Sequence, residues 1–148
     1  MEKCSDFMTQ NPICCMSGDS VERAAQLMLA EDVGSIPIVD DSHSRKLIGI
    51  LTDRDIALRI VAEARDAGQI TVREVMTKTP ICCASDDELQ RALDTMATNQ
   101  VRRVPIVDSH NRVVGIIAQG DIATRFDQPE KTAEVVKEIS RHGCLVFD

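Results

Sequence analysis

The sequence has almost no aromatic residues, since it holds three Phe and neither Tyr nor Trp. A flat ligand would therefore have to be held between aliphatic side chains. A basic surplus is also missing, because 24 Asp and Glu outnumber 17 Lys and Arg and give a net charge of −7. Nucleic-acid binding usually needs a basic face, so this balance argues against nucleic acid as a partner.

Targeting and membrane signals are missing as well. No apolar run approaches the roughly 20 residues of a membrane helix, and the stretch Met1–Asp6 has no signal-peptide core. These absences predict a cytoplasmic protein with no membrane partner. The 148 residues, 43% of them hydrophobic, are enough for one compact domain with a real core.

The six cysteines include no Cys-x-x-Cys spacing, which zinc sites usually show. They include two adjacent pairs, Cys14–Cys15 and Cys82–Cys83. Neighbouring side chains on a strand face opposite ways, so each pair directs one thiol inward and one outward. We expect all six to be free thiols that act as small hydrophobic groups. A redox role for the pairs is the alternative.

Catalytic patterns are missing too. The sequence has no Gly-rich phosphate loop, no metal-ligand cluster and no Ser/His/Asp arrangement with supporting context. It therefore predicts a protein that is not an enzyme and requires no cofactor.

What the sequence does contain is an internal repeat, the first feature to look for in any chain. Pro37–Asp40 recurs as Pro105–Asp108, an offset of 68 residues (105 less 37). Gly49–Ala57 matches Gly115–Ala123 at an offset of 66 (115 less 49), so one loop is two residues shorter in the second copy. The offset of 68 also relates Met8–Thr9 to Met76–Thr77 and Pro12–Cys15 to Pro80–Cys83.

The first helix of each copy is predicted from a cap and an apolar stripe. Asp19 with Glu22 three residues later, and Ser85 with Glu88, have the spacing of helix N-caps. Apolar residues then recur at helical spacing, which predicts one buried face on each helix. The stripes are Val21, Ala24, Ala25 and Met28 in the first copy, and Leu89, Ala92, Leu93 and Met96 in the second.

A hairpin and a second helix follow. Ile36–Val39 and Lys46–Leu51 read as strands, joined by the turn residues Asp40–Ser44. Thr52 is predicted to open a helix that runs towards Ala64, with Gly68 as its C-terminal stop.

Each copy thus reads strand, helix, strand, strand, helix, which predicts an α+β fold. One copy of roughly 60 residues buries too little surface to be stable alone, so we expect the two copies to share a core. A last helix is predicted at residues 128–142, with Pro129 at its start and with Thr132, Val135, Val136 and Ile139 on one side. It would serve as a lid or dimer contact, or else as a solvated tail.

The motifs resemble the cystathionine-β-synthase (CBS) domain, twice over. The resemblance rests on Asp-x-Met-Thr-x-x-Pro from Asp6, Ala-Ala-x-x-Met from Ala24, the stretch Gly34–Asp40 and the stretch Gly49–Ile56. It implies a tandem CBS pair, or Bateman module, with pseudo-two-fold symmetry and frequent homodimers. The repeats are expected at residues 4–67 and 68–127.

The resemblance also implies a ligand site in clefts between the copies, where many members bind AMP, ADP, ATP or S-adenosylmethionine. Thr52 and Asp55 form Thr-x-x-Asp at a strand-to-helix junction. This pattern is a helix cap, and a capping hydroxyl can also contact a phosphate while the carboxylate accepts ribose hydroxyls. In the second copy Ala118 replaces the Thr and Asp121 remains, which favours tighter binding at Thr52 and Asp55.

Other site residues follow from the same resemblance. Arg102 and Arg103 form the only adjacent basic pair, and Arg103 is our choice for a phosphate contact. The first strand of each copy would border the base, and the Pro-Ile-Val strand would supply apolar walls. These residues are Ile13, Cys14, Ile36 and Pro37 in the first copy, and Ile81, Cys82, Val104 and Pro105 in the second.

The sequence therefore predicts a regulatory module that binds an adenosine-containing ligand and passes the bound state to a protein target. The alternative is a ligand-free interaction or stress-response protein whose dimer surface is its functional part.

Overall fold

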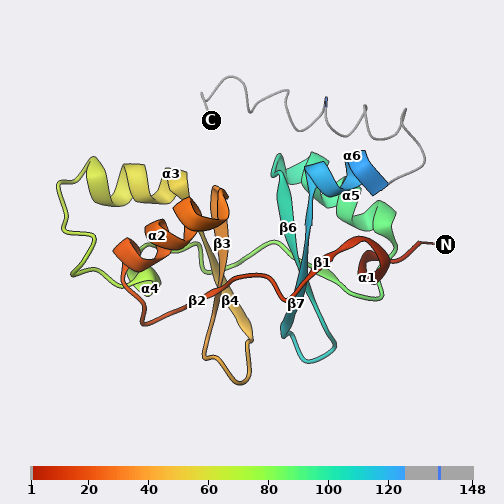
Figure 1. Cartoon of the computed structure of the whole chain (residues 1–148), viewed down its shortest axis with the longest axis horizontal. Coiled ribbons are helices and arrows are strands. Elements are labelled where there is room, and N and C mark those ends of the chain that lie inside the picture. Colours follow the sequence, from red (N-terminus) through yellow and green to blue (C-terminus); the bar gives the residue numbers. More distant parts are fainter. Residues whose placement is uncertain (1, 126–136, 138–148) are drawn as a thin grey trace. The chain divides into compact units, whose positions relative to one another are not determined.

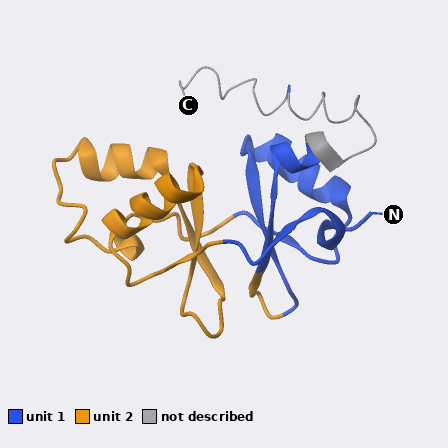
Figure 2. Ribbon diagram, in the orientation of Figure 1, with its two compact units in different colours: residues 1–12, 81–109, 114–148 blue, residues 13–80, 110–113 orange. Residues whose placement is uncertain are grey.

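The computed structural model describes residues 2–125 and Lys137. Within this part the chain forms two compact units (Figure 2). Unit 1 combines residues 2–12, 81–109 and 114–125, and unit 2 combines residues 13–80 and 110–113. The helix expected at residues 128–142 lies, apart from Lys137, outside the described residues.

Unit 2 contains a three-stranded sheet in the order β2-β3-β4 (Figure 1). Strand β3 runs parallel to β2 and antiparallel to β4, with Pro37 opposite Ile50. The predicted hairpin is therefore confirmed. The elements are β2 (Cys15–Met16), α2 (Val21–Glu31), β3 (Ser35–Val39), β4 (Leu47–Thr52), α3 (Asp53–Ile56), the π-helix η1 (Ala57–Val61) and α4 (Val72–Val75).

Unit 1 repeats this plan with a four-stranded sheet in the order β1-β7-β6-β5. Strand β5 runs parallel to β6, as β2 does to β3. The elements are α1 (Cys4–Phe7), β1 (Thr9–Gln10), β5 (Cys83–Ala84), α5 (Leu89–Asn99), β6 (Arg103–Val107), β7 (Val113–Ala118) and α6 (Gln119–Arg125). The predicted α+β class and the duplication are confirmed. Among residues 2–125, no helix has the length and apolar character needed to cross a membrane.

The two sequence copies exchange their Met-Thr segments. Thr9, near the start of the chain, pairs with Ile116 on β7. Thr77, which the repeat assigns to the second copy, pairs with Ile50 on β4 through hydrogen bonds of 2.8 and 3.0 Å. Each compact unit is therefore completed by residues from the other sequence copy.

The buried residues form two separate cores, one in each unit, so the expected single shared core is wrong in that form. The core of unit 2 includes Val72, Val75 and Met76, which follow the first sequence copy. The core of unit 1 includes Cys4 and Phe7, which lie at the start of the first sequence copy. The two copies share residues by exchange instead. The short helix before each Met-Thr segment, α1 or α4, packs its apolar side chains into the same core as that segment.

The repeated glycines of β4 and β7 make room for the exchanged methionines. A Cβ atom on Gly49 would lie 2.5 Å from the Met76 Sδ atom and 2.9 Å from the Thr77 carbonyl oxygen. A Cβ atom on Gly115 would meet the Met8 side chain in the same way. Glycine is thus needed at this position of each copy because a side chain would collide with the methionine, and not because the backbone conformation requires it.

The apolar stripes of the two long helices are confirmed, but their predicted caps are wrong. Leu89, Ala92, Leu93 and Met96 are all buried, as are Val21, Ala24 and Met28, while Ala25 is half-buried. The cap of α2 is Ser20, whose hydroxyl accepts the Arg23 N–H at 3.0 Å. The N-cap of α5 is Glu88 itself rather than Ser85.

The acidic residue before each helix holds the preceding turn instead. The Asp19 carboxylate accepts the Met16 N–H at 2.9 Å, and the Asp87 carboxylate accepts the Ala84 N–H at 2.8 Å. Both residues tie the end of a short strand to the turn that follows, so Asp19 is not available as a cap.

The helix predicted to open at Thr52 does so, as α3, and continues as the π-helix η1. It ends in a turn at Ala64, which has a φ of 55°, rather than at Gly68. No described glycine has a positive φ, so the expected glycine stop is wrong.

Candidate functional site

Thr52 and Asp55 of unit 2 form a reciprocal capping box at the start of α3. The Thr52 Oγ1 atom accepts the Asp55 N–H at 3.0 Å, and the Asp55 Oδ2 atom accepts the Thr52 N–H at 3.0 Å. A hydroxyl both accepts and donates, so Thr52 keeps one hydrogen to donate while it caps. The two hydrogen bonds of the box order both side chains. They lie at the end of β4, where Thr52 is opposite Ser35 in the sheet.

The second oxygen of the Asp55 carboxylate faces an arginine. Its Oδ1 atom lies 4.0 Å from the Arg59 Nη2 atom, and the side chains of Asp55 and Arg59 are 13% and 50% exposed. The Arg59 Nη1 atom donates to the Val75 carbonyl at 2.5 Å, which fixes the guanidinium against α4. Asp55 therefore presents one oxygen beside a positive charge while the other oxygen caps the helix.

Gly34 and Asp53 also belong to this part of unit 2. The Asp53 N–H donates to the Gly34 carbonyl at 2.8 Å, and a Cβ atom on Gly34 would lie 3.0 Å from the Asp53 carboxylate. Asp53 is exposed. The neighbourhood of Thr52 thus carries a second acidic group that our sequence reasoning missed, although its position directly after Thr52 was a visible signal.

Unit 1 builds the corresponding junction with different side chains. The Gln119 N–H donates to the Arg102 carbonyl at 2.8 Å, so Arg102 and Gln119 stand where unit 2 has Gly34 and Asp53. The Asp121 Oδ2 atom accepts the Ala118 N–H at 3.1 Å. Asp121 therefore performs half of a capping box even without a partner hydroxyl, which gives this residue a structural reason of its own.

The two adjacent arginines of unit 1 differ in exposure. Arg102 is exposed, whereas Arg103 begins β6 and is half-buried. Gly120 lies in the first turn of α6, where a Cβ atom would meet nothing within 4 Å. Arg102 and Arg103 thus stand at the start of β6 in unit 1, at the positions that Gly34 and Ser35 occupy in unit 2.

The residues expected to border a base fall into two groups. Ile13 and Ile81 are 45% and 37% exposed, unusual values for large apolar side chains. Their neighbours Cys14 and Cys82 are half-buried, as expected for the outward thiol of each pair. The expected wall residues lie instead inside the units, where Ile36, Pro37, Val104 and Pro105 are all buried.

Each unit therefore collects half of the expected site residues. In unit 2, β3 carries Ile36 and Pro37 between β2, which follows Ile13 and Cys14, and β4, which ends at Thr52. In unit 1, β6 carries Arg103, Val104 and Pro105 between β5, which follows Ile81 and Cys82, and β7, which ends at Ala118.

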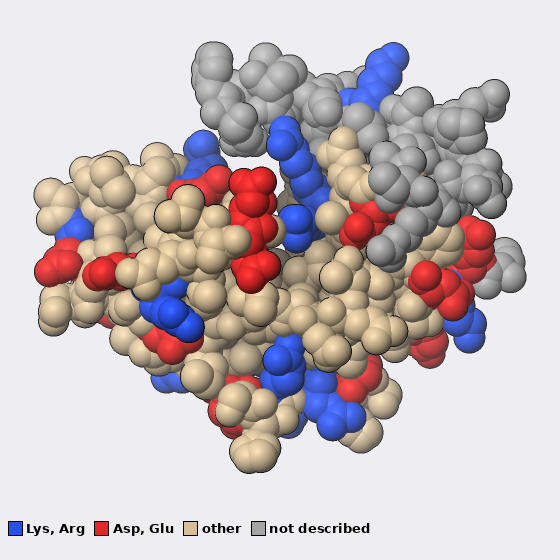
Figure 3. All heavy atoms as spheres, in the orientation of Figure 1, with Lys and Arg blue, Asp and Glu red and all other residues tan. Residues whose placement is uncertain are grey.

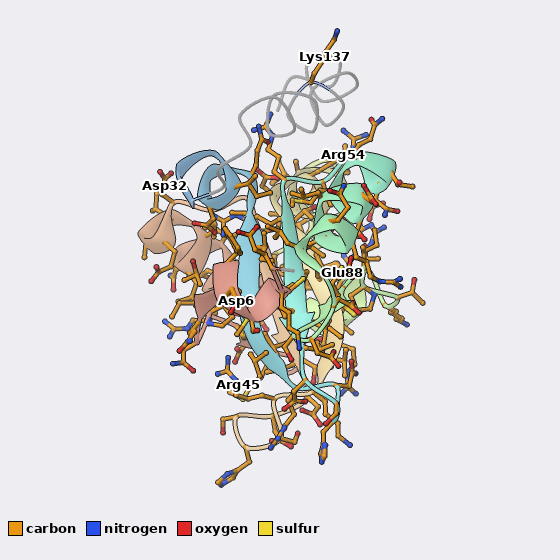
Figure 4. All side chains as sticks on the ribbon, turned by 90° about the vertical axis from the view of Figure 1, so that its right-hand side faces the viewer. Asp6, Asp32, Arg45, Arg54, Glu88 and Lys137 are labelled. Atoms are coloured by element: carbon orange, nitrogen blue, oxygen red, sulfur yellow. The ribbon has the colours of Figure 1, made fainter. Side chains whose placement is uncertain are left out.

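The thiols are placed for packing. The five described cysteines, Cys4, Cys14, Cys15, Cys82 and Cys83, are free. Burial raises the pKa of Cys4 to about 12 and that of Cys15 to about 11. Burial also raises the pKa of Cys14, although the Arg45 guanidinium, 3.5 Å from its Sγ atom, acts in the opposite direction. Arg45 is labelled in Figure 4.

Two other kinds of site find no support in the described part of the chain. Residues 2–125 and Lys137 contain no group of three His, Cys, Asp or Glu side chains that could hold a metal ion. On the face drawn in Figure 3, the acidic and basic side chains of these residues are intermixed, with no continuous basic area.

The duplicated fold and the two junctions match a known family. A model of the CBS domain matches residues 4–62 and again residues 72–127. The chain belongs to the CBS domain family. CBS pairs of this kind are regulatory modules, and the boundaries 4–67 and 68–127 remain our prediction for the two repeats.

Two relatives match this chain over most of their own length. The CBS domain-containing protein YhcV of Bacillus subtilis is 39% identical over 143 residues, which cover 97% of this chain and 99% of YhcV. Hypoxic response protein 1 of Mycobacterium tuberculosis is 34% identical over 128 residues, which cover 86% of this chain and 87% of that protein.

Two solved structures extend the comparison. Hypoxic Response Protein I with two coordinated zinc ions has a TM-score of 0.76 at 33% identity, over 84% of this chain and 98% of that one. The CBS domain pair of protein MJ0100, in complex with 5′-methylthioadenosine and S-adenosyl-L-methionine, has a TM-score of 0.72 at 32% identity. That match covers 85% of this chain and 96% of the other.

Proposed function

We propose that this CBS pair is a non-enzymatic regulatory protein that binds an adenosine-containing ligand: S-adenosylmethionine, AMP, ADP or ATP. The observation that carries the proposal is the ordered pair Thr52 and Asp55, which joins a hydroxyl to a carboxylate at the end of β4. The MJ0100 pair, 32% identical and bound to two adenosine compounds, supports the same class of ligand.

Thr52 and Asp55 supply complementary contacts for a ribose or a ribose phosphate. The Thr52 hydroxyl donates its remaining hydrogen, and the Asp55 Oδ1 atom accepts from a ligand hydroxyl. The Arg59 guanidinium lies 4.0 Å from the same oxygen and partly offsets the negative charge of the carboxylate. The exposed Ile13 offers an apolar surface for a base, as an ordinary ligand site requires.

The charges around the two junctions favour different ligands. Asp53 and Asp55 give unit 2 two carboxylates within four residues, which suits the cationic sulfonium and ammonium groups of S-adenosylmethionine. Arg102 and Arg103 give unit 1 a positive charge that suits a phosphate. We therefore propose that the residues around Thr52 favour S-adenosylmethionine over AMP, and that those around Asp121 show the reverse order.

For any one ligand, the hydroxyl of Thr52 adds a contact that Ala118 lacks. A hydrogen bond to a charged group contributes about 1.5–3 kcal/mol, which is roughly a tenfold to hundredfold gain in affinity. A phosphate fork on Arg103 would oppose this advantage for AMP, ADP and ATP but not for S-adenosylmethionine.

Regulation would follow from differential binding. A ligand shifts a protein between two states only when it binds one of them more tightly. We propose that the bound state is passed to a protein target, and Asp55 would carry this effect because the adjacent Arg59 also holds the Val75 carbonyl.

The test is calorimetric titration of ligand-stripped protein with S-adenosylmethionine and with AMP. Asp55→Asn and Asp121→Asn are matched variants, since an Asn side-chain oxygen still accepts the N–H that each Asp caps. Asp55→Asn should weaken S-adenosylmethionine at least tenfold, and Asp121→Asn should leave it unchanged. An absence of heat for both ligands in the wild type would reject the proposal in favour of a ligand-free interaction protein.

A further inference from the structure

The helix that follows Thr52 changes from an α-helix to the π-helix η1, residues Ala57–Val61. The wide turn of η1 is held by the Ala62 N–H, which donates to the Ala57 carbonyl at 2.9 Å. Residues 123–125 correspond to the first three residues of η1 at the repeat offset of 66, and they belong to the α-helix α6. Short π-helical turns are frequent at functional sites, so this difference between the repeats points to a role of η1 beyond packing.

Arg59, at the centre of η1, links Asp55 of the proposed ligand site to helix α4. Its Nη2 atom lies 4.0 Å from the Asp55 Oδ1 atom, and its Nη1 atom donates to the Val75 carbonyl at 2.5 Å. The first distance is too long for a hydrogen bond, so Asp55 can accept a ligand hydroxyl without losing a hydrogen bond to Arg59. The second contact is a charge-assisted hydrogen bond and is the stronger of the two.

A second arginine holds the start of α4. The Arg65 Nη2 atom lies 3.9 Å from the Glu74 Oε1 atom. The other oxygen of Glu74 accepts the N–H of Thr71, the N-cap of α4, at 3.0 Å. Arg65 pairs with Glu74, whereas Arg59 pairs with Asp55. The two arginines therefore hold the same helix, and they offer a matched comparison in which the link to the ligand site differs.

The contacts of Arg59 close a ring that passes through the exchanged segment of unit 2, Met76–Thr77. Val75 is the last residue of α4 and directly precedes this segment. Thr77 pairs with Ile50 of β4 through hydrogen bonds of 2.8 and 3.0 Å. Strand β4 ends at the ligand site, so the ring of contacts starts and finishes there.

We propose that Arg59 is a positioning residue through which a ligand at Asp55 holds the exchanged segment Met76–Thr77 on β4. A ligand hydroxyl fixes the Asp55 carboxylate, and the fixed carboxylate restrains the Arg59 guanidinium. The guanidinium in turn holds the Val75 carbonyl and thereby the segment that follows it. Such coupling is reciprocal, so opening of the segment weakens ligand binding by the same factor.

The exchanged segment is suited to report the bound state. Met76 is 8% exposed and packs where Gly49 makes room for it, so the segment is anchored in the core of unit 2. Thr77, Lys78 and Thr79 are exposed, so a change in the segment reaches a surface that a protein target can contact. This inference rests on the proposed ligand site at Asp55 and names the part of unit 2 that responds to it.

The test is amide hydrogen exchange of the full chain, followed by NMR at the Thr77 and Ile50 N–H groups. Calorimetry first establishes which of S-adenosylmethionine and AMP binds the wild type, and that ligand is then used at saturation. In the wild type the ligand should slow exchange of both amides at least about fivefold, the lower end of typical coupling factors between sites. Arg59→Gln should still bind the ligand, and at saturation it should lose this protection.

Arg65→Gln is the matched control. Without ligand, Arg59→Gln and Arg65→Gln should both exchange faster at Thr77, because each releases one end of α4. Only Arg65→Gln should keep the slowing by the ligand. Arg59→Lys retains the positive charge and serves if Arg59→Gln folds poorly. It should also lose the protection, since its single nitrogen cannot contact both groups as the two guanidinium nitrogens do.

Two results would overturn the coupling and leave the ligand site standing. One is a wild type that binds ligand without slower exchange at Thr77, and the other is protection that persists in folded Arg59→Gln. Calorimetry that detects no binding of either ligand to the wild type would instead reject the site and the coupling together. Circular dichroism of each variant establishes that it is folded.

Discussion

Two fragments of nearly equal length should differ sharply in their ability to fold. Residues 1–67 cover the first sequence copy, and residues 13–80 cover most of unit 2 with its exchanged segment. Only the second fragment contains Val72, Val75 and Met76, which complete the core of unit 2. We expect residues 13–80 to unfold cooperatively and residues 1–67 to be unfolded or aggregated.

The magnitude follows from burial. Val72, Val75 and Met76 are 0%, 1% and 8% exposed, and burying one such side chain contributes about 1.5–3 kcal/mol. The three together contribute about 5–9 kcal/mol as an upper estimate. A small domain has a total stability of about 5–15 kcal/mol, so their loss leaves little or nothing. Residues 1–67 also lose the two hydrogen bonds between Ile50 and Thr77.

The assay is thermal unfolding of both fragments followed by far-ultraviolet circular dichroism, with the full chain as reference. The Tm of residues 13–80 should lie below that of the full chain, because the fragment lacks residues 110–113, which also belong to unit 2. A cooperative transition in residues 1–67, or equal loss of structure in both fragments, would show that the exchanged segment is not what completes the unit.

Three further predictions concern packing and the thiols. Gly49→Ala should lower the free energy of unfolding by about 1–3 kcal/mol through overpacking against Met76, whereas Gly18→Ala, where a Cβ atom meets nothing within 4 Å, should have little effect in the same urea titration. Thiol titration of the denatured chain under anaerobic conditions should report all six cysteines, and a disulfide-linked peptide would contradict this. Because burial raises the pKa of Cys4 to about 12 and of Cys15 to about 11, these thiols ionise first in the unfolded chain, so stability should be complete below pH 9 and fall towards pH 11–12. Cys4→Ala should reduce that alkaline slope, and an unchanged slope would argue against the buried thiol as its source.

The sequence was sufficient for the features that are periodic or repeated. The stripe of Leu89, Ala92, Leu93 and Met96 and the hairpin of β3 and β4 follow from spacing alone. The pairing of Thr52 with Asp55 also follows, because a capping box is defined by residues three apart. Local patterns of this kind depend on nothing outside the segment that contains them.

Features that depend on distant partners were out of reach. Asp19 has the spacing of a cap, but its carboxylate binds the Met16 N–H and leaves the helix to Ser20. The exchange of the Met-Thr segments joins residues far apart in the chain, so no local pattern reports it.

Equilibrium dialysis is the most direct test of an adenosine-binding function. The chain has no Trp or Tyr, so adenine absorbance at 260 nm can be read in the presence of protein with little interference. Stripped protein dialysed against S-adenosylmethionine should accumulate the ligand on its side of the membrane, and Asp55→Asn should accumulate at least tenfold less at subsaturating ligand. Equal concentrations on both sides for the wild type, with S-adenosylmethionine and with AMP alike, would contradict the proposed function.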